Sequence, residues 1–178
     1  MTIDAINRSF LIDQTKEEIE PNSRTMVLIG GWADWTSLSD IAKAYKLAGD
    51  DIVEKAYDTL EFAHEYTYPV IFLYRHAVEL ILKSIHPQFK KKHTLESLRD
   101  YLVQELKGKV AQSFIDKVRD RINDFNLIDK RSTRFRYGDG DPESEFLVHL
   151  PHLRSVVNDL FVIIEELAKH KAQEALLK

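Results

Sequence analysis

The sequence predicts a mainly α-helical protein, an antiparallel bundle of four to six helices that follows a short β-hairpin or an extended arm. From residue 37 onward, apolar side chains recur every three or four positions, which is the period of an amphipathic helix. With 178 residues and 44% hydrophobic composition, the chain can bury one sizeable core. We therefore expect an arm over residues 1–36 and a single helical bundle over residues 37–178.

Composition narrows the class of protein. The chain has no cysteine, which excludes a disulfide framework and thiolate chemistry and favours the cytoplasm. It shows no signal-peptide pattern and no apolar run of membrane-spanning length, so we expect a soluble protein without a membrane partner. The formal net charge of −4 argues against a uniformly basic nucleic-acid-binding protein, although local basic patches can bind phosphate.

The first helices follow from capping and breaking residues. In the arm, the apolar runs 9–12 and 25–29 are suited to strands. Ser37 is the expected N-cap of the first helix, with Asp40 three residues later, and Gly49 is its expected end. A second helix should run from about Asp51, and Pro69 should lie in the first turn of the third. The buried residues expected in the first two helices are Leu38, Ile41, Ala42, Tyr45, Val53, Ala56, Tyr57, Leu60 and Ala63.

Residues 68–83 form the most apolar predicted helix, and one stripe of charged side chains crosses it. Arg75, Glu79 and Lys83 follow one another at i, i+4 spacing, and His76 lies beside them. A helix this apolar must be buried on most sides. The charged stripe must therefore face water or groups from other segments. This pattern predicts a polar seam inside the bundle.

Three more segments carry the helical period. Thr94 should cap the next helix and Gly108 should close it, and the last helix should start near Pro151. Residues 129–144 read as a loop, and the tail from residue 169 is expected to fray. The wide apolar faces of the central and last helices favour a surface for a homodimer, and the alternative is that a monomer buries the same residues. The expected core residues are Leu95, Leu98, Leu102 and Leu106, then Val110, Phe114, Val118, Ile122 and Phe125, and finally Leu153, Val156, Val157, Leu160, Phe161, Ile163, Ile164 and Leu167.

Two basic stretches should meet if successive helices alternate in direction. They hold seven of the chain's 25 cations: Lys90, Lys91, Lys92, Lys130, Arg131, Arg134 and Arg136. With Phe89, Phe135 and Tyr137, these cations could offer phosphate-binding charge beside stacking faces, as a site for single-stranded nucleic acid does. The alternative is that the charges are solvated and that Phe135 and Tyr137 close the end of the bundle.

Three stretches carry a resemblance to a known superfamily. They are residues 74–83 (YRHAVELILK), 93–98 (HTLESL) and 132–137 (STRFRY). Their order resembles that of the HEPN superfamily over roughly residues 41–167. The resemblance implies a prokaryotic bundle of four or five helices, commonly a homodimer, in toxin–antitoxin or phage-defence systems. It also implies RNA as a ligand, metal-independent ribonuclease activity without a cofactor, and a protein partner such as an antitoxin or a defence component.

The sequence departs from the catalytic pattern of that superfamily. Active members carry an Arg followed, after four to six residues, by a His near the start of the last helix, and no pair here has this spacing. Arg134 and Arg136 lie in the corresponding region, but His149 and His152 follow at much longer intervals. The departure favours a lost or rearranged catalytic site.

A metal-free ribonuclease needs a base, an acid and a cation that stabilises the phosphorane, and His and Arg suit these roles. The candidate catalytic residues are Arg75, His76, His93 and Arg136, and the candidate nucleic-acid-binding residues are Lys90, Lys91, Lys92, Arg131, Arg134 and Tyr137. No metal site is expected. The structural alternatives are a Glu79–Arg75 pair along the helix, a buried Glu79–Arg136 bridge that fixes the long loop, and a helix-start role for His93.

Two function classes therefore remain open. The first is an RNA-directed HEPN-like protein, either a divergent ribonuclease or a toxin-type effector. The second is a non-catalytic helical module for dimerisation or protein interaction, in which the same polar residues are structural ties. Replacement of Arg136 distinguishes the two classes, because an enzyme should lose activity and keep its fold, whereas a structural tie should lose thermal stability.

Overall fold

The computed structural model describes residues 37–58, 63–86, 94–130, 133–137 and 145–176, and these residues are almost entirely helical. The helices are α1 (Leu38–Asp58), α2 (Ala63–Ser84), α3 (Leu95–Leu106), α4 (Gln112–Ile128), α5 (Arg134–Tyr137) and α6 (Leu150–Leu176). The predicted mainly α-helical bundle is confirmed. The expected strands 9–12 and 25–29 lie outside the described residues.

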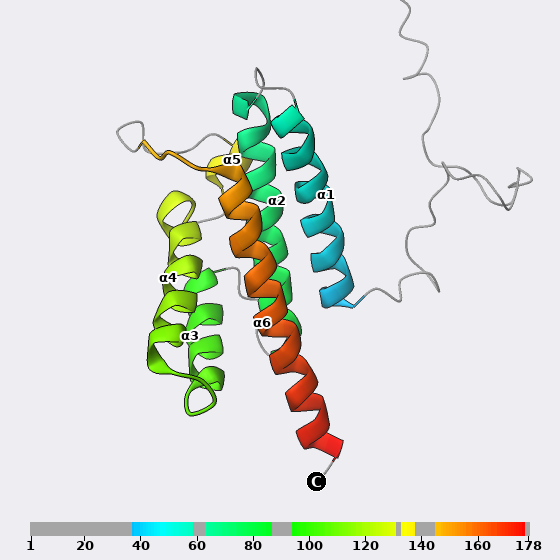
Figure 1. The fold of residues 1–178 in the computed structure, drawn as a ribbon, viewed down its shortest axis with the longest axis vertical. Coiled ribbons are helices and arrows are strands. Elements are labelled where there is room, and N and C mark those ends of the chain that lie inside the picture. Colours follow the sequence, from blue (N-terminus) through cyan, green and yellow to red (C-terminus); the bar gives the residue numbers. More distant parts are fainter. Residues whose placement is uncertain (1–36, 59–62, 87–93, 131–132, 138–144, 177–178) are drawn as a thin grey trace, which may run out of the picture. The chain divides into compact units, whose positions relative to one another are not determined.

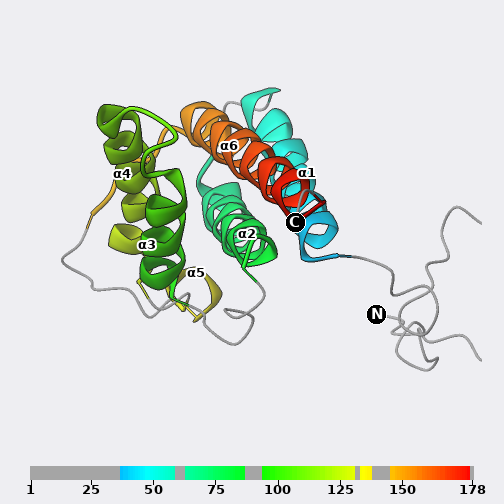
Figure 2. The same cartoon turned by 90° about the horizontal axis from the view of Figure 1, so that it is seen from below.

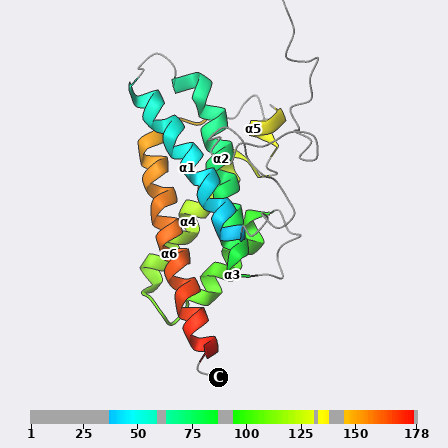
Figure 3. The same cartoon turned by 90° about the vertical axis from the view of Figure 1, so that its right-hand side faces the viewer.

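Helix α2 is the central element, because it contacts α1, α3, α5 and α6. Figure 1 shows α1 running antiparallel to both α2 and α6, and Figure 3 shows these three helices side by side. Helices α3 and α4 form an antiparallel pair on the other side of α2, as the view along the bundle in Figure 2 shows. The most apolar helix of the sequence is therefore enclosed from several directions.

The expected alternation of helix directions is wrong at one connection. Figure 1 shows α3 running in the same direction as α2. The eight peptide units between His86 and Thr94 can span roughly 25 Å, which is enough chain to return along α2 before the next helix begins. Lys90, Lys91 and Lys92 lie outside the described residues, so their meeting with the segment after α4 remains a prediction.

The predicted caps at Ser37 and Gly108 are confirmed, whereas Thr94 stands at the N-cap position of α3 without a side-chain hydrogen bond to the helix. At the start of α1, the Asp40 backbone N–H donates to Ser37 Oγ (3.2 Å) and the Ser37 N–H donates to Asp40 Oδ2 (3.0 Å). Hydrogen bonds from Ser37 lower the pKa of Asp40. After α3, Gly108 adopts φ +76°, a left-handed conformation that other residues rarely adopt, and the chain turns towards α4 there.

Gly49 does not end a helix, and this expectation is wrong. Helix α1 continues through it to Asp58, so the two predicted helices are one. A Cβ atom at residue 49 would lie 2.7 Å from Cε1 of Tyr74, a ring of α2 that is itself fully buried. The glycine therefore allows close approach of α1 and α2 and accepts the lower helix propensity that comes with it.

Pro69 also lies deeper in its helix than expected. Helix α2 begins at Ala63, so Pro69 stands in its second turn and cannot donate a hydrogen bond to the carbonyl of Glu65. An interior proline costs about 3 kcal/mol relative to alanine. Burial of the apolar residues that follow Pro69 offsets this cost.

The predicted core is confirmed for most of the described side chains, with one correction in α4, whereas Tyr57, Leu60 and Ala63 lie outside the described side chains. Val110 and Phe114 are 40% and 39% exposed, because α4 starts at Gln112 and turns Ile115 inward instead. Helix α6 starts at Leu150, as expected, but remains helical to Leu176 instead of fraying from residue 169. One turn, α5, also forms within the predicted loop. The buried residues of α3, α4 and α6 are Leu95, Leu98, Leu102 and Leu106, then Ile115, Val118, Ile122 and Phe125, and Leu150, Val157, Leu160, Phe161, Ile164 and Leu167.

The close contact at Gly49 yields a test of helix packing. Replacement Gly49→Ala should destabilise the protein by about 1–2 kcal/mol, because overpacking against Tyr74 outweighs the better helix propensity of alanine. Urea denaturation followed by circular dichroism measures the change. The matched control is Ala44→Gly, at an exposed position of α1, which should destabilise by about 1 kcal/mol through propensity alone. A more stable Gly49→Ala variant would contradict the packing argument.

Candidate functional site

A chain of alternating charges lies buried along α2. Arg75, Glu79 and Lys83 are 0%, 3% and 4% exposed. Arg75 Nη1 donates to Glu79 Oε2 (3.3 Å), and Lys83 Nζ donates to Glu79 Oε1 (2.6 Å). The predicted polar seam is therefore present, with Glu79 between two cations, as the i, i+4 spacing indicates.

Asp129, directly after α4, continues this chain. Arg75 Nε donates to the Asp129 carbonyl oxygen (3.0 Å) and lies 3.9 Å from its Oδ2. Oδ1 of the same residue accepts the backbone N–H groups of Thr133 (2.9 Å) and Arg134 (3.3 Å) at the start of α5. Asp129 thus connects α2, the end of α4 and the start of α5. We call Arg75, Glu79, Lys83 and Asp129 the buried ladder.

The buried ladder is electrically balanced, with two cations and two anions. A buried charge is tolerated when it is paired and hydrogen-bonded. Glu79 accepts from both Arg75 and Lys83, and the Asp129 carboxylate accepts two backbone N–H groups at Oδ1 and has Arg75 Nε 3.9 Å from Oδ2. The Arg75 side chain is enclosed, so a phosphate could reach it only if the surrounding helices moved apart. This geometry favours the structural alternative for Arg75.

His76 lies in a different environment from its neighbour. Its ring contacts the edge of Tyr45 of α1 (centroids 4.5 Å apart) and is nearly parallel to Phe72 of α2 (5.9 Å, 3° between planes). Arg75 instead contacts the end of α4. The two adjacent candidates therefore belong to separate interfaces of α2, and the structure does not bring them together.

The other candidates are described in part or not at all. Arg134 is half-buried in α5, and its guanidinium lies 5.3 Å from the centroid of the Phe146 ring. The side chains of Arg136 and Tyr137 are not among those described, so the Glu79–Arg136 bridge remains a prediction. The candidates outside the described residues are Lys90, Lys91, Lys92, His93 and Arg131.

Sequence reasoning missed two polar clusters that join helices. Asp50 of α1 is 7% exposed, accepts hydrogen bonds from Tyr74 Oη (2.7 Å) and Lys46 Nζ (2.6 Å), and lies 3.4 Å from Arg154 Nε of α6. Burial, followed by the hydrogen bond to Asp50, raises the pKa of Tyr74 well above its usual value. The Lys46–Asp50 spacing was the available signal, but it could not identify the partners on α2 and α6.

The second cluster joins α3 to α6. Tyr101 Oη donates to Glu105 and accepts from Lys171, whose Nζ also lies 3.3 Å from Glu105 Oε1. Burial and the hydrogen bond to Glu105 raise the pKa of Tyr101, and the same hydrogen bond lowers the pKa of Glu105. The edge of the His86 ring contacts the Tyr101 ring at a centroid distance of 3.9 Å. The side chains of this cluster therefore make hydrogen bonds, an ion pair and a ring contact with one another.

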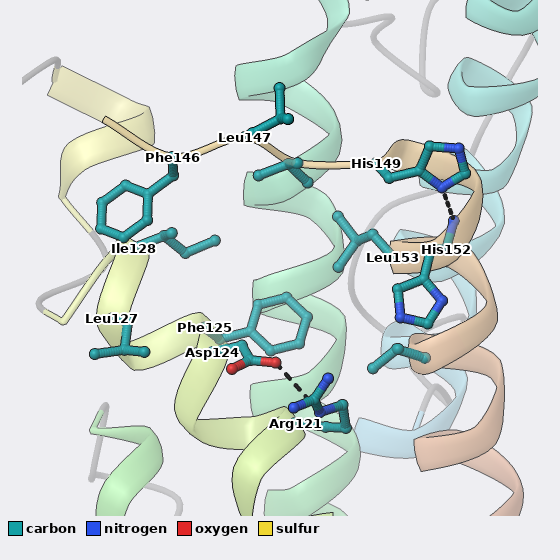
Figure 4. A pocket seen from close by; sticks show the side chains of 12 residues that line it. Arg121, Asp124, Phe125, Leu127, Ile128, Phe146, Leu147, His149, His152 and Leu153 are labelled. Carbon is teal, nitrogen blue, oxygen red and sulfur yellow. Dashed lines mark hydrogen bonds and ion pairs between the residues drawn. The ribbon is translucent and has the colours of Figure 1, made fainter. Parts of the chain in front are cut away.

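An apolar cavity of about 270 Å³ opens between α4 and the start of α6. Figure 4 shows Phe125, Ile128 and Leu153 around it, with Phe146 and Leu147 on the segment that precedes α6. At its rim, Arg121 Nε lies 3.3 Å from Asp124 Oδ2. His149 Nδ1 accepts the backbone N–H of His152 (3.2 Å), so His149 caps α6.

A second cavity of about 660 Å³ continues this opening between α4 and α6. The two cavities share Arg121, His152 and Val156, so they form one groove, which we call the α4–α6 groove. Exposed apolar side chains line it, including Phe114 from α4 and Val162 from α6. Sequence reasoning missed the groove because it assigned Phe114 to the core.

Comparison of the chain with family models, with curated proteins and with solved structures finds no match. The resemblance to the HEPN superfamily therefore rests on the three stretches quoted above and remains a hypothesis. Among the described helices, none combines the length and the apolarity that a membrane crossing needs.

The buried ladder yields a stability prediction. Replacement Arg75→Ala should destabilise the protein by about 3–5 kcal/mol, because Asp129 and Glu79 lose a buried cationic partner. Urea denaturation at neutral pH measures the loss. The matched control is Lys43→Ala, which removes an exposed pair with Glu165 (2.9 Å) and should cost less than about 1 kcal/mol. If the two variants are equally stable, Arg75 is not a structural tie and its catalytic role gains support.

Proposed function

We propose that this bundle is a non-catalytic helical interaction module and that two copies pair through the α4–α6 groove. The observation that supports the proposal most directly is the groove itself, whose apolar lining is open to solvent. The buried polar residues of α2 support it further, because Arg75, Glu79 and Lys83 are engaged with one another and with Asp129.

Exposed apolar side chains in the groove favour binding of a partner. Phe114 and Val162 are 39% and 59% exposed within it, and Leu127 and Leu147 are largely exposed beside its narrower end. A partner that covers these side chains removes them from water, which is favourable by about 25 cal/mol for each Å² of apolar surface buried.

Charge favours a second copy as the partner. Lys117 and Arg121 line the groove from α4 together with Asp120 and Asp124, and Asp159 lines it from α6. In a twofold dimer the same patch faces itself, so an antiparallel placement can bring cations of one groove opposite carboxylates of the other. A groove that carries charges of both signs can in this way complement its own copy, whereas a partner of a single charge sign would face some like charges.

Charge substitutions in the groove test the pairing. Phe114→Glu and Val162→Glu should convert a dimer into a monomer, because each places a carboxylate in an apolar interface. Light scattering after size-exclusion chromatography measures the mass. Leu47→Glu is the matched control, since Leu47 is 62% exposed on α1 and does not line the groove. A wild-type protein that stays monomeric up to millimolar concentration, or a dimer unaffected by both substitutions, contradicts the proposal.

RNA binding, with cleavage by a divergent site, is the second candidate function. The observation that favours it is the corner between α4 and α5, where Lys130 is exposed and Arg134 is half-buried. Arg131, Arg136 and Tyr137 follow in the same short stretch of sequence. Cations beside aromatic rings suit the backbone and the bases of a single strand. This reading is supported by fewer described contacts than the first.

Cleavage assays decide between the two candidates. The purified protein is incubated with structured and single-stranded RNAs without divalent metal, and the product ends are sequenced. The interaction module predicts no products. A divergent ribonuclease predicts products that vanish in Arg136→Ala and His93→Ala variants whose thermal stability is unchanged. If Arg136→Ala instead lowers the melting temperature by several degrees, Arg136 is a structural tie.

A further inference from the structure

The residues of α4 that line the α4–α6 groove are arranged almost symmetrically about Arg121, which lines both cavities. Phe114 precedes Arg121 by seven residues and lines the wider cavity. Ile128 follows Arg121 by seven residues and lines the narrower one. At a rise of 1.5 Å per residue, these two positions lie roughly 10 Å on either side of Arg121. A twofold axis that crosses α4 at Arg121 would therefore place Phe114 of one copy opposite Ile128 of the other.

Helix α6 has the same kind of symmetry about His152 and Val156, which both line the two cavities. Val162 follows them in the wider cavity, and Phe146 and Leu147 precede them in the narrower one. Figure 1 shows α4 and α6 running antiparallel, so the end of α4 and the start of α6 lie at the same end of the groove. One axis through the middle of the groove would therefore also place Val162 opposite Phe146 and Leu147.

The narrower cavity has room for an aromatic ring. It encloses about 270 Å³ and is lined mainly by apolar side chains, among them Phe125, Ile128 and Leu153. An apolar cavity of roughly 150 Å³ is enough to bind benzene. Phe114 is 39% exposed in its own groove, so it has apolar surface that a partner can cover. Its ring therefore suits the narrower cavity of a second copy in size and in polarity.

The charges on this side of α4 agree with the same register. Lys117 lies four residues before Arg121 and Asp124 lies three residues after it, so the axis would bring Lys117 opposite Asp124 of the partner subunit. The two Arg121 side chains would face each other at the axis, and each has Asp124 of its own helix 3.3 Å away. Asp120, beside Arg121, lies 3.6 Å from Arg119 Nε. In this register both cations of the groove have a carboxylate nearby.

We propose that the two copies pair in one antiparallel register, centred on Arg121, in which Phe114 of each copy inserts into the narrower cavity of the other. The inference rests on the pairing proposed above and adds its register and its anchor residue. Each dimer then holds two Phe114 anchors, symmetrically placed about the axis. Aromatic side chains buried in pockets are among the residues that dominate the binding energy of an interface.

Disulfide formation tests the register, because the chain has no cysteine of its own. After mild oxidation, Arg121→Cys should give a covalent dimer, since residue 121 faces its own copy at the axis. Lys117→Cys and Asp124→Cys should each remain unlinked, whereas the double variant should be linked. These two positions are two turns apart on one helix, too far for a bond within one chain. Non-reducing gel electrophoresis measures the linked fraction, and Leu47→Cys, exposed on α1, is the unlinked control.

A dilution series followed by light scattering tests the anchor. Phe114→Ala should weaken pairing by about 30-fold or more, as loss of a hot-spot side chain does, while its helix content is unchanged. Leu47→Ala should pair as the wild type does.

Two results overturn the inference and leave the pairing standing. One is a wild-type dimer whose Arg121→Cys variant and double variant both stay unlinked, and the other is a Phe114→Ala variant that pairs as tightly as the wild type. A wild-type protein that stays monomeric at millimolar concentration instead overturns the pairing, and the inference fails with it.

Discussion

Burial of the Arg75 guanidinium constrains much of the surrounding structure. A cation with no exposed surface must find its acceptors within the protein, and Arg75 takes one from Glu79 on its own helix and another from Asp129. Because the second acceptor is a main-chain carbonyl, it fixes the path of the chain after α4 and not merely one side chain. The Asp129 side chain also accepts the backbone N–H groups at the start of α5, so the corner that carries Arg134 and Phe135 is fixed relative to α2.

Polar contacts of this kind complement an apolar core that has little directional preference of its own. Leucine and isoleucine faces hold helices together but tolerate small shifts and repacking. Asp50 ties α1 to α2 and α6, and Tyr101 with Lys171 ties α3 to α6. Each contact has a defined geometry and is satisfied in one register of its helices. The polar residues of this bundle therefore fix how the helices are placed against one another. The interaction-module hypothesis assigns them this structural role.

Much of the fold could be predicted from local signals in the sequence, whereas contacts between distant segments could not be predicted. The Ser37 cap, the four leucines of α3 and the start of α6 follow from spacing and capping alone. The role of Gly49 was predicted wrongly, because the residue that requires a glycine there is Tyr74, 25 residues away in the sequence. Within the candidate site, the i, i+4 order of the ladder on α2 was readable, but the role of Asp129 was not, since it depends on where α4 ends. The α4–α6 groove could not be predicted either, because periodicity does not say which apolar residue stays uncovered.

The contact between Gly49 and Tyr74 has a consequence for the order in which the protein folds. Helices α1 and α2 are consecutive in the chain, so their contacts close short loops and cost little chain entropy. The Arg75–Asp129 and Tyr101–Lys171 hydrogen bonds join residues 54 and 70 positions apart. Contacts between near neighbours form faster than those between distant segments. We therefore expect the α1–α2 hairpin to form first and to act as the template on which α6 and the α3–α4 pair assemble, with the buried charges locked in only at the end.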